Sequence, residues 1–134
     1  MGDPMTITLN GTTGITTPAI DNQGNLTVDG GTIKLDGNYP VGTDNVALGN
    51  YALSSGSLSG SYNTALGSAS LTSNTTGSQN TAVGRDSARA NTTGTANVAI
   101  GQSALASNTS GGSNIAVGED SLYSNSTASN NTAV

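Results

Sequence analysis

Catalytic chemistry in this chain would have to rest on carboxylates, hydroxyls, Lys or Tyr, because its 134 residues include no His and no Cys. The eight acidic residues are scattered, and the best constellation is Asp86 with Asp120, each two residues after a Gly. These Gly residues hold equivalent positions in a repeat, two units apart, so stacked units would place the two carboxyl groups roughly 9 to 10 Å apart. That separation approaches the upper limit for the two carboxyl groups of an inverting glycosidase.

Two isolated surface acids are the simpler interpretation of this pair. The unit between them has Ser103 at the equivalent position, and nothing in the pattern indicates a groove that could hold a sugar. Arg85 and Glu119 also share a column, which predicts at most a weak surface ion pair. The segment DNQGN (21–25) lacks the distal Glu of a calcium-binding loop. We therefore predict a protein that is not an enzyme, with no catalytic residue, no cofactor and no metal site.

The charge balance and the apolar composition exclude two classes of partner. The formal net charge is −5, and Lys34, Arg85 and Arg89 are the only cationic residues, so we expect no nucleic-acid binding. No apolar run approaches the ~18 residues of a membrane-spanning helix, so we expect no membrane insertion. The sequence has no Phe and no Trp, and its hydrophobic core has to be built in thin layers from Ala, Val, Leu and Ile.

The elements that would position any functional group come from a repeat. Between residues 45 and 134 the pattern Asn-x-Ala-aliphatic-Gly returns six times, and the last copy stops at Val134, before its Gly. The copies are NVALG (45–49), NTALG (63–67), NTAVG (80–84), NVAIG (97–101), NIAVG (114–118) and NTAV (131–134). Their first Asn residues are 18, 17, 17, 17 and 17 positions apart, a short fixed period that is typical of stacked repeats. We expect the chain to be a fragment cut within the sixth repeat.

The period predicts strands rather than helices. Helical repeats need about 33 residues or more, whereas each unit here has about 17, with Gly and β-branched residues at fixed positions. Two short segments, separated by Gly and by an Asn-Thr-Thr-Gly cluster, indicate strand, turn, strand, turn. We expect each unit to form a flattened coil with two strands of about four or five residues, paired in parallel with the next coil. The predicted fold class is an all-β parallel solenoid, or β-roll.

Stacking assigns each motif position to a column. Period-2 alternation puts the aliphatic residue on one face of the strand and the Asn, Ala and Gly on the other. We expect the aliphatic column to form the interior of the coil, together with a second column of Leu53, Leu71, Ala88, Leu105 and Leu122. The Gly column would supply a backbone bend, and the Asn column would pass amide hydrogen bonds from coil to coil. The four motif columns are Asn45, Asn63, Asn80, Asn97, Asn114 and Asn131; Ala47, Ala65, Ala82, Ala99 and Ala116; Leu48, Leu66, Val83, Ile100 and Val117; and Gly49, Gly67, Gly84, Gly101 and Gly118.

A single stack of such coils is short of stabilising contacts. Each thin coil buries few aliphatic side chains, while ordering its backbone costs conformational entropy at every residue. A further buried surface is therefore needed. We expect it on the strand face that carries the Ala column, where small side chains would let a second copy approach closely. The sequence thus predicts an obligate homo-oligomer.

The repeat also resembles a known family. The runs NVALG, NTALG, NTAVG, NVAIG and NIAVG, each followed by Ser or Ala and then usually Leu, are similar to the head repeats of trimeric autotransporter adhesins, the YadA-like left-handed parallel β-roll. The longer period, with SNTTG or a relative as an added turn, is more similar to repeats in phage tail-fibre and appendage proteins. The resemblance covers residues 45–134 and implies a homotrimer of left-handed β-rolls in a rigid adhesive fibre. It implies no catalytic residue.

The N-terminal residues are organised differently. Residues 1–4 are interpreted as a remnant of an expression tag. Residues 5–44 are interpreted as a small β region, because aliphatic-x-aliphatic-Asn/Asp-Gly predicts a short strand and a tight turn. The pattern occurs as ITLNG (7–11), LTVDG (26–30) and IKLDG (33–37). MTITLNGTTGI (5–15) resembles the start of phage virion proteins, so this region is either an attachment point for other virion proteins, a stem, or a cap of the roll.

The resemblance implies a function. We expect a structural and adhesive section of a trimeric phage tail fibre or appendage on the virion surface, with a host glycan or receptor as a partner. The head of a bacterial trimeric autotransporter adhesin, on the bacterial cell surface, is the alternative. An ice-binding solenoid is a lower-ranked alternative, because Thr75, Thr76, Thr92 and Thr93 begin a threonine ladder. A fibre-bound depolymerase would need its active part in a downstream sequence.

N-glycosylation sequons recur in the predicted turn. They begin at Asn74, Asn91, Asn108 and Asn125, at the same position of four successive units. Because they return with the period, we interpret them as a consequence of the turn sequence rather than as glycosylation sites.

Overall fold

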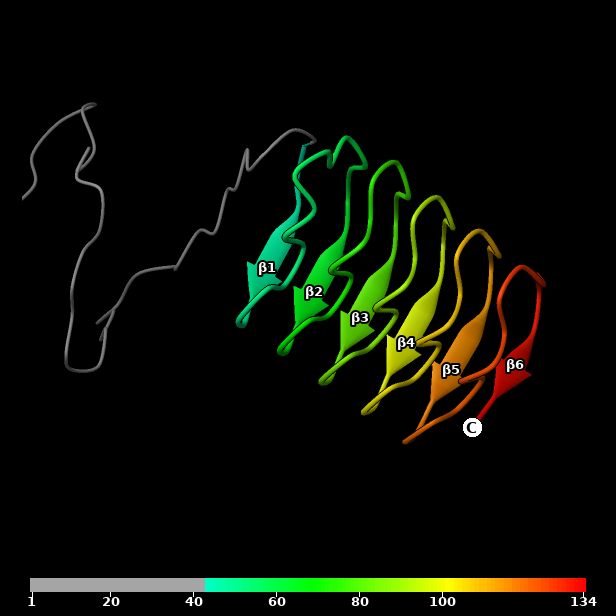
Figure 1. The fold of residues 1–134 in the computed structure, drawn as a ribbon. Coiled ribbons are helices and arrows are strands. Elements are labelled where there is room, and N and C mark those ends of the chain that lie inside the picture. The colour runs from blue at the N-terminus through cyan, green and yellow to red at the C-terminus, as the bar shows by residue number, and fades with distance from the viewer. Residues whose placement is uncertain (1–42) are drawn as a thin grey trace, which may run out of the picture. The chain divides into compact units, whose positions relative to one another are not determined.

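The structure, a computed structural model, describes residues 43–134. This part of the chain forms one parallel six-stranded sheet, in which the strands follow each other in chain order (Figure 1). The strands are β1 (Val46–Leu48), β2 (Thr64–Leu66), β3 (Thr81–Val83), β4 (Val98–Ile100), β5 (Ile115–Val117) and β6 (Thr132–Ala133). After each strand the chain makes one full turn and returns beside the strand it has just left. The predicted all-β parallel solenoid with a 17-residue period is confirmed. The predictions for residues 1–42 lie outside the described residues.

The motif stays in phase along the whole stack. Ala65 pairs with Ala82, Ala82 with Ala99, and Ala99 with Ala116. The first coil is one residue longer, yet Ala47 still pairs with Ala65. The extra residue lies between Leu53 and Gly60, because the amide of Asn45 still reaches the carbonyl of Gly60, 15 residues away, whereas the next coil spans the same contact with 14. The strand register is therefore held while the far side of the coil absorbs the insertion.

Each coil has one strand, not the predicted two. The segment that follows the motif Gly is a run of turns in every coil. Its backbone still bonds to the next coil, since Leu71 N donates to Ser87 O at 3.1 Å and Ser73 N to Arg89 O at 3.2 Å. The second predicted strand is wrong because its residues do not keep an extended backbone.

Left-handed backbone explains this difference. In the third coil, Asp86, Ala88 and Ala96 have φ of 58°, 47° and 55°, and equivalent residues of the other coils behave alike. Such φ values cost an L-residue roughly 1–2 kcal/mol and are incompatible with an extended strand. They let the chain curl within a few residues, so the second apolar column is presented from a curled segment rather than a flat one.

The inside and the outside of the strand are the reverse of our expectation. Ala65, Ala82, Ala99 and Ala116 are 0% exposed and belong to the core, where they lie with the buried Leu column of the turn segment. The aliphatic residues of the motif point outward instead, with Leu48 at 47% and Ile100 at 39% exposure. The alternation of the two faces was predicted correctly, but the face that turns inward was not. The second column, with Leu53, Leu71, Ala88 and Leu105, is interior as predicted, and Leu122 is partly buried.

The reason for the reversal is the buried asparagine column. Asn63, Asn80, Asn97 and Asn114 are at most 1% exposed. The backbone N–H of each donates to the side-chain oxygen of the equivalent asparagine in the preceding coil. Asn80 N donates to Asn63 Oδ1 at 3.0 Å, and Asn97 N donates to Asn80 Oδ1 at 3.0 Å. A buried amide that satisfies its polar atoms in this way is stable in a protein interior. Since Ala shares the inward face with Asn, the aliphatic residue between Ala and Gly must face out.

A second asparagine column, which we did not predict, runs through the Asn-Thr-Thr-Gly turn. Asn74, Asn91 and Asn108 are 0% exposed. Asn91 Nδ2 donates to Asn74 Oδ1 at 2.9 Å, and Asn108 Nδ2 to Asn91 Oδ1 at 2.8 Å. This column begins at Asn74, because the first coil has the fully buried Leu58 in this part of its interior. We call the two columns the strand ladder and the turn ladder.

The two ladders meet at one carbonyl in each coil. Gly94 O accepts a hydrogen bond from Asn80 Nδ2 of the strand ladder at 2.9 Å and from Asn91 Nδ2 of the turn ladder at 3.0 Å. A Cβ at Gly94 would lie only 2.3 Å from Asn91 Oδ1 and 2.5 Å from Gly111 O. The turn therefore needs Gly here because of close packing. Gly77 and Gly111 hold the same position in the neighbouring coils.

The motif Gly is required for a different reason, in agreement with its predicted role. Gly84 has φ of 129°, and a Cβ there would lie 2.5 Å from Gly101 O of the next coil. Both the backbone conformation and the space exclude a side chain. The bend at this position carries the chain from the sheet into the turn segment.

We predict that Ala82→Leu destabilises the roll, whereas Val83→Leu does not. A leucine at the inward position overpacks a thin core, which should lower the free energy of unfolding by about 1–3 kcal/mol or prevent folding. The outward position already holds leucine in the first two coils, at Leu48 and Leu66. Urea unfolding followed by circular dichroism measures both, and equal losses would mean that the two faces are assigned wrongly.

We further predict that Asn80→Ala lowers the free energy of unfolding by about 1–3 kcal/mol, because it removes the acceptor of the buried Asn97 N–H. The matched control is Gln79→Ala, at the exposed position next to it. This change should shift the urea midpoint little. A loss that is no greater for Asn80→Ala than for the control would argue against the strand ladder as a stabilising element.

Candidate functional site

The most distinctive surface of the described chain is the outward face of the sheet. It consists of the second and fourth motif positions in each repeat, and we call it the outer sheet face. Its residues are Val46, Thr64, Thr81, Val98, Ile115 and Thr132, with Leu48, Leu66, Val83, Ile100, Val117 and Val134. Every one of these side chains is half-buried or exposed. The face thus offers apolar groups and threonines in two straight columns, without a charged residue.

An uncovered parallel sheet of this kind is unusual. Parallel sheets are found almost only where both faces are covered, because their strands are rich in apolar residues on both sides. Within residues 43–134, the coil covers the inner face of this sheet and leaves the outer face open (Figure 1). Ile115 and Leu48 are 43% and 47% exposed. The outer sheet face therefore has the composition of a buried surface and the exposure of a free one.

Comparison among the coils shows how unusual this is for a column that faces outward. The position directly after the motif Gly diverges from coil to coil, through Asn50, Ser68, Arg85, Gln102 and Glu119, and every one of these residues is exposed. The fourth motif position stays aliphatic in all six repeats. An exposed column without a partner has no physical reason to stay apolar, since apolar area in water costs free energy. Covering this column would remove that cost.

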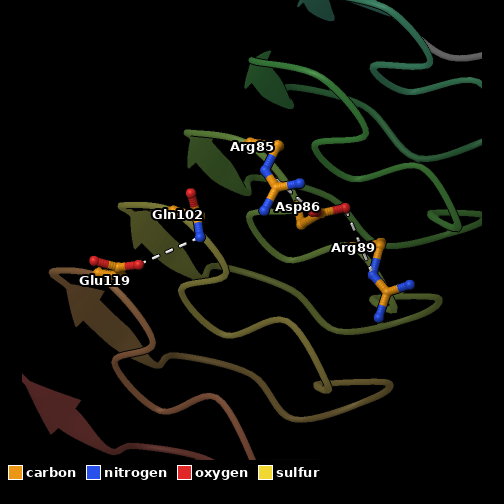
Figure 2. Close-up of polar contacts among 5 residues, drawn as sticks. All are labelled: Arg85, Asp86, Arg89, Gln102 and Glu119. Carbon is orange, nitrogen blue, oxygen red and sulfur yellow. Dashed lines mark hydrogen bonds and ion pairs between the residues drawn. The ribbon is translucent and has the colours of Figure 1, made fainter.

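The two acids singled out in the sequence, Asp86 and Asp120, lie at equivalent positions two coils apart. Asp86 lies between two arginines, with Oδ2 3.6 Å from Arg85 Nε and Oδ1 3.8 Å from Arg89 Nε (Figure 2). Asp120 is exposed two coils away, and Ser103 lies at the equivalent position between them. No group of three or more His, Cys, Asp or Glu side chains gathers within residues 43–134. The arrangement is that of a small charged cluster on an exposed surface.

Arg85 and Glu119, expected to form a weak pair, have other partners. Arg85 lies with Asp86, while Glu119 Oε1 accepts a hydrogen bond from Gln102 Nε2 at 3.3 Å (Figure 2). Gln102 comes from the coil between them and occupies the same column. This column therefore changes along the stack from a cationic coil to an acidic one.

The threonines of the turn have two different environments. Thr75, Thr92 and Thr109 donate their hydroxyl hydrogens to a carbonyl of the next coil at 2.9–3.0 Å. Thr76 and Thr93, one position further, are exposed. Half of the threonine ladder thus holds neighbouring coils together, and only the other half is directed to solvent.

Sequence reasoning missed the outer sheet face because it placed the aliphatic column inside. One signal could have found it. The Ala of the motif is the same residue in every repeat, whereas the aliphatic position varies among Leu, Val and Ile. A tightly packed interior accepts a single side chain, here Ala, whereas a looser contact accepts Leu, Val or Ile. Identity rather than hydrophobicity therefore marks the inward face.

The fold and this surface define the described chain as a parallel β-solenoid repeat protein with an open apolar sheet face. Comparison with family models, with curated proteins and with solved structures gave no match. Among the described residues, none forms a helix long and apolar enough to span a bilayer.

We predict that Asp86→Asn changes the free energy of unfolding by less than about 1 kcal/mol. The substitution removes the charge attracted by two exposed arginines, and exposed ion pairs contribute little. Asn also accepts the left-handed backbone of this position, so no new strain is introduced. Thermal unfolding at low and at high salt measures the effect. A large loss that disappears in high salt would show that the cluster is a major stabilising element.

Proposed function

We propose that this chain is a structural section of a homotrimeric fibre, in which the outer sheet face of each roll packs against the other two. The observation that carries the proposal is the outward column, half-buried or exposed, that stays aliphatic in all six repeats. Burying the exposed part of such a side chain contributes roughly 1 kcal/mol, and each copy brings two columns over six strands. The contact needs no desolvation of charge, because the face has none.

Three identical copies suit this surface better than an unrelated partner does. Copies aligned in parallel present columns with the same spacing, so every coil meets its counterpart at the same height. A closed ring of copies also leaves no outer sheet face open for further growth. The resemblance of the repeat to YadA-like heads favours three copies and a left-handed roll over other arrangements.

The role of such a fibre is mechanical and adhesive. The chain carries its variation at the position after the motif Gly, away from the sheet, and keeps its frame constant. We place it in a phage tail fibre or appendage on the virion surface, where it takes part in host attachment and where residues 5–44 contact other virion proteins. The head of a bacterial trimeric autotransporter adhesin, on the cell surface, is the alternative that shares the same assembly.

A glycan or receptor would contact the surface that stays free in the trimer. That surface includes the turn segment with Arg85, Asp86 and Arg89 on one coil and Glu119 with Asp120 two coils away. Its charges vary along the stack and could select a partner, whereas the constant columns could not.

The ice-binding alternative has weaker support. The hydroxyl groups of Thr75, Thr92 and Thr109 are used between coils. The exposed hydroxyls of this ladder, on Thr76 and Thr93, lie in a turn, and on the outer sheet face the column of Thr64, Thr81 and Thr132 is interrupted by Val46, Val98 and Ile115. Neither set forms the continuous flat array of hydroxyls that an ice-binding surface would need. Thermal hysteresis of the purified chain separates the two functions.

We predict that Ile100→Lys dissociates the trimer and leaves the roll folded. A charged side chain in the middle of the outer sheet face would be buried without a partner, which the assembly cannot compensate. In sedimentation equilibrium the native chain should give about 39 kDa, three times the 13.1 kDa of one chain, and the variant 13.1 kDa. The control is Gln102→Lys, in the exposed column after the Gly, which should remain trimeric.

A stable 13.1 kDa species of the native chain at micromolar concentration would contradict the proposal. Binding to polysaccharides and to host-type cells tests the adhesive role. Labelling of parent particles in electron microscopy with an antibody against this chain tests its location. Substrate turnover that is lost on changing Asp86 or Asp120 would overturn the non-enzymatic role.

A further inference from the structure

The sequons of the repeated turn coincide with the turn ladder. In three of them, at Asn74, Asn91 and Asn108, the acceptor asparagine is 0% exposed. The fourth, Asn125, is partly buried and lies in the last complete coil. An oligosaccharide attached to any of the first three would have to leave the coil through packed backbone. The fold and the modification therefore compete for the same atom, the side-chain nitrogen.

The hydrogen bonds of the turn ladder conflict with glycosylation whatever the size of the attached sugar. Asn91 Nδ2 uses both of its hydrogens, one toward Asn74 Oδ1 at 2.9 Å and one toward Gly94 O at 3.0 Å. Asn108 Nδ2 does the same toward Asn91 Oδ1 and Gly111 O. An N-linked sugar replaces one of these hydrogens, so a glycosylated asparagine can make only one of the two bonds. If the lost bond is the one along the turn ladder, Asn74 Oδ1 or Asn91 Oδ1 is left buried without a partner, whereas Gly94 O and Gly111 O keep their bonds from Asn80 Nδ2 and Asn97 Nδ2.

We propose that Asn74, Asn91 and Asn108 accept an N-linked oligosaccharide only in the unfolded chain, and that a glycan at any of them prevents the roll from closing. The co-reactant is a lipid diphosphate-linked oligosaccharide, presented by its transferase. The amide nitrogen attacks the anomeric carbon, a C–N bond forms, the C–O bond to the diphosphate breaks, and the nitrogen loses one proton. The lipid diphosphate leaves, with no oxidation or reduction.

The same chain contains a sequon that escapes the competition. Asn130-Asn131-Thr132 begins at an exposed residue, outside both ladders. In the folded roll, Asn130 keeps its backbone bond to Gly112 O at 3.0 Å whatever happens to its side chain. A glycan at Asn130 is therefore compatible with the fold, and this position serves as an internal control for access of the transferase.

The inference, which does not depend on the proposed function, limits where this protein can be made. A chain of such repeats folds only where oligosaccharide transfer does not precede folding. A bacterial cytoplasm fits this requirement, and a secretory pathway that glycosylates nascent chains does not.

The test is to express residues 1–134 through the secretory pathway of cultured cells beside a variant without the four turn sequons. That variant is T76A/T93A/S110A/T127A, which keeps every ladder asparagine and changes only exposed residues. Mass spectrometry gives the occupancy of each asparagine. Trypsin reports folding, because the peptide carbonyls of Arg85 and Arg89 are bonded to neighbouring coils. An unfolded control, Ala82→Asp, shows what the transferase modifies when no roll forms.

We expect the trypsin-resistant fraction of the native chain to carry no glycan at Asn74, Asn91 or Asn108, and the unfolded control to carry glycans at all three. The variant without the four turn sequons should give at least a several-fold larger resistant fraction than the native chain. Glycan at Asn130 should occur in resistant and sensitive molecules alike. Resistant molecules glycosylated at Asn91 would overturn the proposal, and so would an unfolded control that stays unmodified at the three sites.

Discussion

The structure depends on one shared acceptor, the carbonyl of the turn glycine. In the third coil Gly94 O receives the amides of Asn80 and Asn91, one from each end of the coil. In the 17-residue coils this contact spans 14 residues, as from Asn80 to Gly94, and the next strand ladder residue, Asn97, follows three residues later, whereas the longer first coil keeps the contact across 15 residues. It also joins neighbouring coils, since each amide oxygen serves the coil that follows. Within residues 43–134, no buried side-chain polar atom lacks a hydrogen-bond partner.

Because the interior of the roll is polar, apolar side chains are left exposed at its surface. Because amides and alanines occupy the inward face, the larger aliphatic side chains lie outside, where a monomer leaves them in contact with water. The polar atoms of a coil are satisfied within the stack, but its apolar surface is not. The proposed self-association and the constant frame thus rest on the same packing, and in this proposal the residues after the motif Gly contact any other partner.

The period, the parallel pairing and the alignment of columns could be predicted, because each follows from where identical residues recur. The direction of the strand faces could not be read from hydrophobicity. Val83 is more apolar than Ala82, yet hydrogen bonds bury Asn80 and carry Ala82 inward with it. The second strand was predicted wrongly because the residue types of Asp86 and Ala88 do not indicate the left-handed backbone that both adopt. The outer sheet face was missed with the reversal, whereas Asp86 lies in a surface charge cluster with Arg85 and Arg89.

The longer first coil shows which part of the repeat is open to change. Its additional residue lies between Leu53 and Gly60, and the surroundings of Gly56 are empty enough that a side chain there would meet no atom within 4 Å. Ser54, Gly56 and Ser57 are exposed, while strand β1 and the amide of Asn45 keep their positions. A foreign peptide introduced at Gly56 would therefore project from the rod without disturbing the stack. In a three-fold assembly it would be presented three times at one height, which makes this corner a natural position for multivalent display.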